Sequence, residues 1–162
     1  IRDRFRDRYK NHDLLKASPY PGILELMARL RKEGYLIGVS TLKREDYALT
    51  ILEHFQMAPL CDVICGSDFA SKMTKADVIR KCLHTLNLSP DEAVLIGDTG
   101  SDGTGSLETG VDLIGVTYGF GPTEPSGWEK FSPVLVAETA GQIQAFLLKD
   151  GQITTGKEIH TL

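Results

Sequence analysis

The sequence of 162 residues contains no run of about 18 apolar residues, the length that a membrane-spanning helix needs. It has only three cysteines, an odd number with ordinary spacing, which favours reduced thiols and a cytoplasmic protein over a disulfide-bonded one. It also lacks an excess of positive charge, since 18 basic and 22 acidic side chains give a net charge of −4. The first ten residues are charged throughout and show no signal-peptide pattern. We therefore expect neither a membrane nor a nucleic acid as partner.

The composition is that of an ordinary globular domain, with 41% hydrophobic and 25% charged residues. The chain has no internal repeat and no low-complexity tract. Its four histidines are scattered and have no metal-ligand spacing. Nothing in the sequence indicates an oligomeric state.

Strand-like and helix-like segments alternate along the chain. Five short apolar segments predict strands, at residues 35–41, 61–65, 93–96, 112–117 and 134–137. Segments with helical periodicity lie at residues 22–33, 45–56, 74–86 and 140–148. This alternation predicts an α/β fold with a doubly wound, Rossmann-like parallel sheet. In such sheets the ligand site lies at the carboxyl ends of the strands.

The two ends of the chain differ from this core of residues 19–148. Residues 1–18 are charged, with a thin apolar stripe that suits one helix. Residues 149–162 are polar with one weak strand-like patch, and we expect this tail to be peripheral.

Thr41 and Leu42 stand at the end of the strand predicted at residues 35–41. The Thr41 hydroxyl and the backbone amides that follow it can bind a phosphate oxygen. The alternative is that Thr41 is an ordinary β-branched strand residue.

Asp98 directly follows the strand predicted at residues 93–96, and Asp102 lies in the same glycine-rich segment, GDTGSDGTGS. Such a segment lets backbone N–H groups and carboxylates gather around a small charged group. Two carboxylates with oxygen-rich neighbours also suit Mg²⁺. The alternative is that Asp98 or Thr99 only caps the helix that follows.

Lys75 follows Thr74, which forms a capping-box pattern with Asp77 and so predicts a helix start. A cation at that position opposes the helix dipole, at a cost of about 0.3–1 kcal/mol, unless an anionic ligand lies in front of the helix. The alternative is a solvated surface lysine. If Lys75 faces phosphate, its replacement by Met should leave the stability nearly unchanged or raise it slightly, by at most about 1 kcal/mol. A purely structural lysine should instead lose some stability through its aliphatic stem.

Together, GVST at residues 38–41, Lys75 at a helix start and GDTGSD at residues 97–102 resemble the second, third and fourth motifs of the haloacid dehalogenase superfamily. The flanking segments YPGI, SDFASKMTKADVI, GSLETG and GVTYGFG resemble its phosphoglycolate phosphatase-like branch, over roughly residues 5–148. The resemblance implies a Mg²⁺-dependent hydrolase that attacks a small phosphorylated metabolite through an aspartyl-phosphate.

The resemblance also implies a role for each matching residue. Thr41 and Leu42 would bind the phosphoryl group. Lys75 would neutralise the phosphate and steady the nucleophile. Asp98 would hold Mg²⁺, and Asp102 would orient Asp98 or a metal-bound water. These groups would act as a clamp on the charge of a transferring phosphoryl group.

The first motif of the family, Asp-x-Asp after an apolar strand, is absent, as is most of the helical cap. Residues 1–18 resemble the last helix of that cap. The family places the missing strand between the strands at residues 35–41 and 93–96, so we expect a split sheet with two exposed edges. Without the nucleophile we expect the chain alone to be inactive. The N-terminal part could have been lost by cloning, by proteolysis or through an incomplete record, and the sequence is compatible with all three.

Two other interpretations remain open at this point. The first is a non-catalytic phosphate-binding or regulatory module of the same fold that never had the nucleophile. The second is a dehalogenase that needs no metal, against which the acidic pair in GDTGSD argues.

Overall fold

The computed structural model describes residues 19–68, 72–148 and 157–160. The helix predicted within residues 1–18 lies outside the described residues. The helices are α2 (Ile23–Lys32), α3 (Glu45–His54), α4 (Lys75–Leu86), α5 (Gly100–Thr109) and α6 (Ala140–Leu147). The strands are β1 (Ile37–Arg44), β2 (Val63–Ser67), β3 (Ala93–Gly97), β4 (Asp112–Val116), β5 (Leu135–Ala137) and β6 (Lys157–His160). Short 3₁₀ helices lie at Ala58–Leu60, Pro90–Glu92 and Pro125–Phe131.

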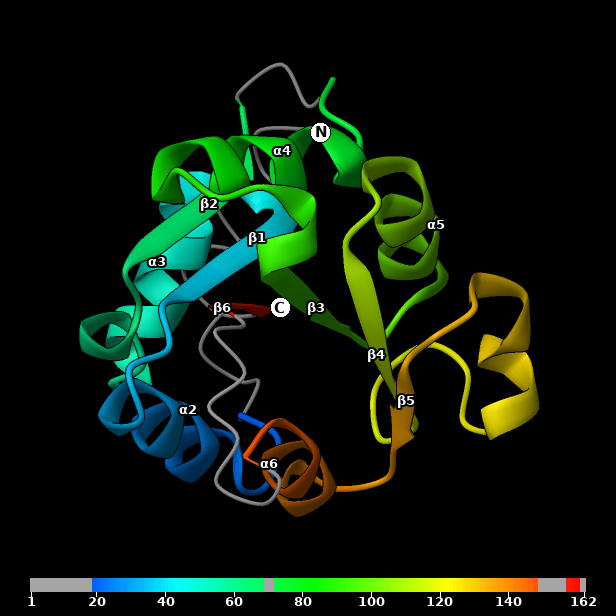
Figure 1. The fold of residues 1–162 in the computed structure, drawn as a ribbon. Coiled ribbons are helices and arrows are strands. Elements are labelled where there is room, and N and C mark those ends of the chain that lie inside the picture. Colours follow the sequence, from blue (N-terminus) through cyan, green and yellow to red (C-terminus); the bar gives the residue numbers. More distant parts are fainter. Residues whose placement is uncertain (1–18, 69–71, 149–156, 161–162) are drawn as a thin grey trace, which may run out of the picture.

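The strands form one parallel six-stranded sheet in the order β2-β1-β6-β3-β4-β5 (Figure 1). Helices α2 and α6 contribute to the hydrophobic core on one face, and α4 contributes with the 3₁₀ helix Pro125–Phe131 to the core on the other. All five residues of β3 are buried, as expected of an apolar run covered on both sides. The predicted doubly wound α/β sheet is confirmed.

The helix boundaries follow from local sequence signals. Helix α2 buries Ile23, Leu26, Met27 and Leu30, and Gly34, which directly follows its cap residue, adopts a φ of 92°. Helix α4 begins with the predicted capping box, in which the Thr74 hydroxyl accepts from the Asp77 N–H. The box fixes Lys75 as the first helical residue, which decides where its side chain goes.

Strand β6 corrects two expectations about the sheet. Residues 157–160 of the tail are not peripheral, because they form a strand at the centre of the sheet, parallel to both β1 and β3 (Figure 1). The sheet is therefore not split, and neither β1 nor β3 presents a free edge at this position. The physical reason is that two unpaired strand edges accept an extended segment through backbone hydrogen bonds, which depend little on side-chain identity.

No helix in the described ranges is long and apolar enough to cross a membrane. The described cysteines are free thiols: Cys65 and Cys82 are buried, and Cys61 is partly buried. Trp128 is fully buried and donates its indole N–H to the Val116 carbonyl at 3.2 Å, so it packs on the sheet and does not stack on a ligand.

Candidate functional site

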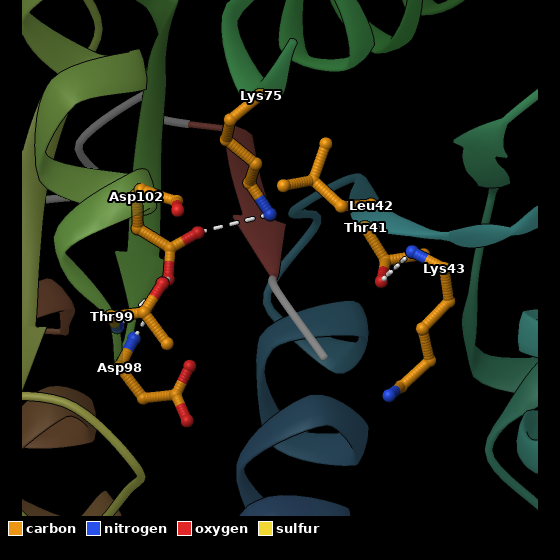
Figure 2. Close-up of a pocket in the computed structure, with 8 residues that line it drawn as sticks. Thr41, Leu42, Lys43, Lys75, Asp98, Thr99 and Asp102 are labelled. Atoms are coloured by element: carbon orange, nitrogen blue, oxygen red, sulfur yellow. Dashed lines mark hydrogen bonds and ion pairs between the residues drawn. The ribbon is translucent and has the colours of Figure 1, made fainter. Parts of the chain in front are cut away.

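The carboxyl ends of β1 and β3 and the start of α4 meet around a cavity of about 250 Å³. The cavity brings together all five residues that the sequence analysis predicted for the site. Figure 2 shows it from close by. Its lining residues are Thr41, Leu42, Lys43, Lys75, Asp98, Thr99, Ser101 and Asp102.

Asp102 is fully buried and holds the turn between β3 and α5. Its Oδ2 accepts hydrogen bonds from the Asp98 N–H at 3.0 Å, from the Thr99 N–H at 3.0 Å and from the Thr99 hydroxyl at 3.1 Å. Its Oδ1 lies 2.9 Å from Lys75 Nζ in an ion pair. The carboxylate of Asp102 thus contacts the backbone of Asp98 and holds the ammonium of Lys75.

Asp98 is not the cap of α5, because Thr99 takes that position in a capping box with Asp102. The Asp98 carboxylate instead lies at the cavity, with the residue only 8% exposed. Its Oδ2 accepts from the Tyr20 hydroxyl at 3.0 Å and from the Phe120 N–H at 3.2 Å. Within the described part of the chain no hydrogen bond reaches its Oδ1, so that anionic oxygen is the one left for a ligand.

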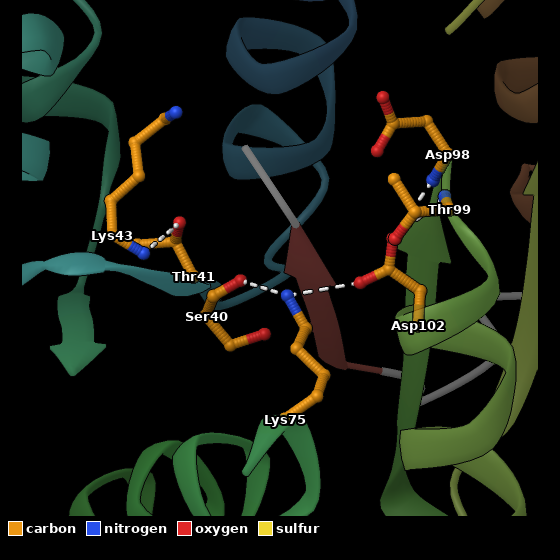
Figure 3. A network of polar contacts seen from close by, with 7 residues as sticks. All are labelled: Ser40, Thr41, Lys43, Lys75, Asp98, Thr99 and Asp102. Carbon is orange, nitrogen blue, oxygen red and sulfur yellow. Dashed lines mark hydrogen bonds and ion pairs between the residues drawn. The ribbon is translucent and has the colours of Figure 1, made fainter. Parts of the chain in front are cut away.

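Lys75 is 6% exposed and points inward from the first turn of α4. Its Nζ donates to the Ser40 carbonyl at 2.6 Å and pairs with Asp102, as Figure 3 shows. Burial lowers the pKa of the Lys75 ammonium, and the Asp102 carboxylate counters part of that shift. The surface-lysine alternative is therefore wrong, and the buried ion pair changes the effect that we expect of Lys75 on stability.

Replacement of Lys75 by Met should lower the free energy of unfolding by about 3 kcal/mol, because it leaves the buried Asp102 carboxylate without its counter-ion. Urea denaturation of the two proteins measures the difference. Lys81→Met is the matched control: its partner is Glu45 at 2.8 Å, but both side chains are more than 40% exposed. The control should lose less than about 1 kcal/mol. Equal losses in the two variants would contradict the buried pair.

The end of β1 supplies the opposite wall of the cavity. Thr41 is fully buried, and its Oγ1 accepts from the Lys43 N–H at 3.1 Å, whereas Leu42 is 45% exposed. Lys43, which the sequence analysis did not place at the site, lies in β1, is half-buried and lines the cavity. Its ammonium and the Asp98 carboxylate lie on opposite sides of the cavity (Figure 2). Side chains two positions apart on a strand lie on the same face, so the prediction of Thr41 at the site could have indicated Lys43 as well.

Tyr20 is another residue at the site that the sequence analysis missed. It lies in the turn before α2 and contacts Asp98, 78 positions further along the chain. Burial and the Asp98 carboxylate raise the pKa of the Tyr20 phenol to about 12. No local pattern marks such a contact, since only the fold brings the two residues together.

The donor set suits a hard cation. The described residues contain no group of three or more His, Cys, Asp or Glu side chains that could hold a metal ion by itself. Mg²⁺ needs only one or two carboxylates, because water and substrate phosphate complete its shell. Asp98 is 8% exposed and lines the cavity, and its Oδ1 atom, which has no hydrogen bond from the described residues, fits that requirement.

The sequence model of haloacid dehalogenase-like hydrolases matches residues 1–116. The chain belongs to this family. It is 33% identical over 118 residues to the phosphoglycolate phosphatase of Rhodospirillum rubrum, covering 72% of this chain and 49% of that protein. It is 34% identical over 118 residues to the tyrosine-protein kinase PtkA of Mycobacterium tuberculosis, covering 72% of this chain and 40% of that protein. The haloacid dehalogenase-like chain thus spans about half the length of the curated relatives it matches.

The fold of this haloacid dehalogenase-like chain also matches solved structures. The crystal structure of a predicted phosphatase from Clostridium acetobutylicum superimposes with a TM-score of 0.85 at 33% identity. The match covers 91% of this chain and 68% of that one. The cavity therefore lies in a fold that this chain shares with about two thirds of the C. acetobutylicum protein.

Proposed function

We propose that this chain is the core of a Mg²⁺-dependent phosphatase that cleaves small phosphomonoesters through an aspartyl-phosphate in a longer protein. The observation that carries the proposal is the convergence of the Lys75 ammonium, the Asp98 carboxylate and the Thr41 hydroxyl on one cavity of about 250 Å³. The three free cysteines support the cytoplasm as its compartment.

Each of these groups has a distinct task at a bound phosphoryl group. The Thr41 hydroxyl and the Leu42 N–H hold one phosphoryl oxygen, and the Lys75 ammonium neutralises the charge of the others. Asp102 keeps Lys75 in place through the ion pair at 2.9 Å. When Mg²⁺ is bound at Asp98, it offsets the negative charge that develops during transfer. Such preorganised charges stabilise the transition state because they need no rearrangement when the reaction occurs.

The nucleophile must come from outside the described residues, because the described carboxylates at the cavity are those of Asp98 and Asp102. Strand β6 ends at His160, level with Val39 and Ile96, two positions short of Thr41 and Asp98. Its sequence, KEIH, is also polar for a central strand between two buried neighbours. We therefore propose that an apolar strand carrying the nucleophilic aspartate takes the place of β6 in the longer protein.

The test is phosphate release by the complete reading frame that contains this chain. Phosphoglycolate, p-nitrophenyl phosphate and phosphotyrosine are assayed with Mg²⁺ and again after chelation with EDTA. The proposal expects turnover of at least one of them that EDTA abolishes. Binding of inorganic phosphate without turnover of any would favour the alternative, a phosphate-binding or regulatory module. Transfer of phosphate from ATP to tyrosine in place of hydrolysis would contradict the proposal and would match the tyrosine-protein kinase activity for which PtkA is named.

Replacement of Gly119 by Ala should lower kcat/KM of the complete protein about 100-fold, because a β-carbon at Gly119 would overlap the Asp98 carboxylate. The displaced Asp98 carboxylate could no longer hold Mg²⁺ beside the phosphoryl group that Lys75 neutralises. Gly141→Ala is the control, since its nearest neighbour would be Thr139 Oγ1 at 3.7 Å. Kinetics of both variants at saturating Mg²⁺ check the prediction, and an unimpaired Gly119→Ala variant would refute the placement of Asp98.

A further inference from the structure

Tyr20 is anchored to the core by the start of α2. The Ile23 N–H donates to the Tyr20 carbonyl at 3.2 Å, and Gly22 turns the chain with a φ of 82°. Ile23 and the buried residues that follow it fix α2 to the sheet. The backbone at Tyr20 is therefore held, and its side chain reaches Asp98 from a defined position.

Three groups surround one side of the Asp98 carboxylate. The Tyr20 hydroxyl lies 3.0 Å and the Phe120 N–H 3.2 Å from the same atom, Oδ2. Gly119 lies so close to this carboxylate that a β-carbon there would overlap it. The Tyr20 ring itself packs edge-on against the ring of Tyr118, with 5.0 Å between the ring centres.

This arrangement gives the two carboxylate oxygens of Asp98 different roles. Two donors occupy Oδ2, so Oδ1 is the oxygen without a hydrogen bond from the described residues. A carboxylate that kept only the Phe120 N–H could turn about its Cβ–Cγ bond and present either oxygen to the cavity. The Tyr20 hydroxyl removes that freedom, because turning would break a hydrogen bond to a charged acceptor.

We infer that Tyr20 is a positioning residue that holds Asp98 so that Oδ1 faces the ligand, and that it thereby sets the affinity of the site for Mg²⁺. The inference rests on the proposed function in one respect, the assignment of Asp98 as the ligand of Mg²⁺. Tyr20 does not touch the substrate or the ion. Its effect should therefore appear in metal affinity and not in the rate at saturating metal.

The test compares Tyr20→Phe with wild type and with Tyr35→Phe in the complete protein. Tyr35 is the matched control, because its hydroxyl donates to the Leu147 carbonyl at 2.9 Å, in a buried place away from the cavity. Calorimetric titration with Mg²⁺ alone gives the dissociation constant, and p-nitrophenyl phosphate hydrolysis gives the Mg²⁺ dependence of the rate. Tyr20→Phe should raise the Mg²⁺ dissociation constant about five- to tenfold, with kcat at saturating Mg²⁺ changed less than about twofold. Tyr35→Phe should leave both values unchanged.

The two readouts keep this inference and the proposed function distinguishable. If wild type hydrolyses the substrate and Tyr20→Phe binds Mg²⁺ as wild type does, the positioning role is overturned while the phosphatase stands. If Tyr20→Phe lowers only the melting temperature, Tyr20 is structural and the inference is equally overturned. If wild type binds Mg²⁺ but hydrolyses no phosphomonoester, the proposed function fails, and the calorimetric comparison alone decides the role of Tyr20.

Discussion

Replacement of Asp98 by Asn should lower kcat of the complete protein by about three orders of magnitude and weaken Mg²⁺ binding. A hard cation prefers an anionic oxygen, and the substitution removes the charge while it keeps the shape of the side chain. The amide oxygen can still accept from the Tyr20 hydroxyl and the Phe120 N–H, at the positions now 3.0 and 3.2 Å from Oδ2. The amide nitrogen, a hydrogen-bond donor, then stands at the position of Oδ1. The loss should therefore come from the missing charge and ligand oxygen and not from a rearranged site.

Asp112→Asn is the matched control for this prediction. Asp112 is an exposed carboxylate at the start of β4, at the opposite end of the strands from the cavity. Its replacement should leave kcat and the Mg²⁺ dependence unchanged. Steady-state kinetics over a range of Mg²⁺ concentrations check both variants. Near-normal turnover of Asp98→Asn at ordinary Mg²⁺ would show that Asp98 does not hold the ion.

The sequence alone was sufficient where a short-range signal determines the structure. The apolar run at residues 93–96 became β3, and the Thr74–Asp77 capping box set the first residue of α4. Because parallel strands end at one edge of the sheet, residues near the carboxyl ends of β1 and β3 had to lie close together. That reasoning brings Thr41, Leu42, Asp98 and Asp102 to one edge of the sheet, where the structure has them line one cavity together with Lys75.

The failures share a different physical origin. The burial of Lys75 depends on α4, α5 and β1 converging around its side chain, and the capping box says nothing about that. The contact of Tyr20 with Asp98 spans 78 positions. Strand β6 has only a weak apolar pattern. Its place is decided by the edges of β1 and β3, which would otherwise be unpaired. Each case depends on tertiary neighbours that a local pattern does not contain.

The 162-residue chain by itself should show no phosphatase activity, and its extension by the upstream reading frame should restore it. On the proposed function, the groups at the cavity would position and polarise a phosphate. The carboxylates described there are Asp102, which pairs with Lys75, and Asp98, which the proposal assigns to the ion, so neither would attack it. The described residues of β6 end at His160, level with Val39 and Ile96, and so do not reach the level of Thr41 and Asp98. An upstream strand in that place would supply the attacking carboxylate.

The extended protein offers its own control for this prediction. Deletion of residues 149–162 from it should leave turnover intact, because the upstream strand then pairs with β1 and β3. Loss of activity on that deletion would show that β6 keeps its central place in the longer protein.

The most direct measurement is a side-by-side assay of the 162-residue chain and the extended protein, both of verified mass, with p-nitrophenyl phosphate and Mg²⁺. Intact-mass analysis during turnover records covalent phosphorylation in the same samples. The account predicts no turnover by the chain alone, turnover by the extended protein, and one phosphoryl group on an aspartate upstream of Ile1. Robust Mg²⁺-dependent turnover by the 162-residue chain would contradict it, because a nucleophile would then lie within these residues.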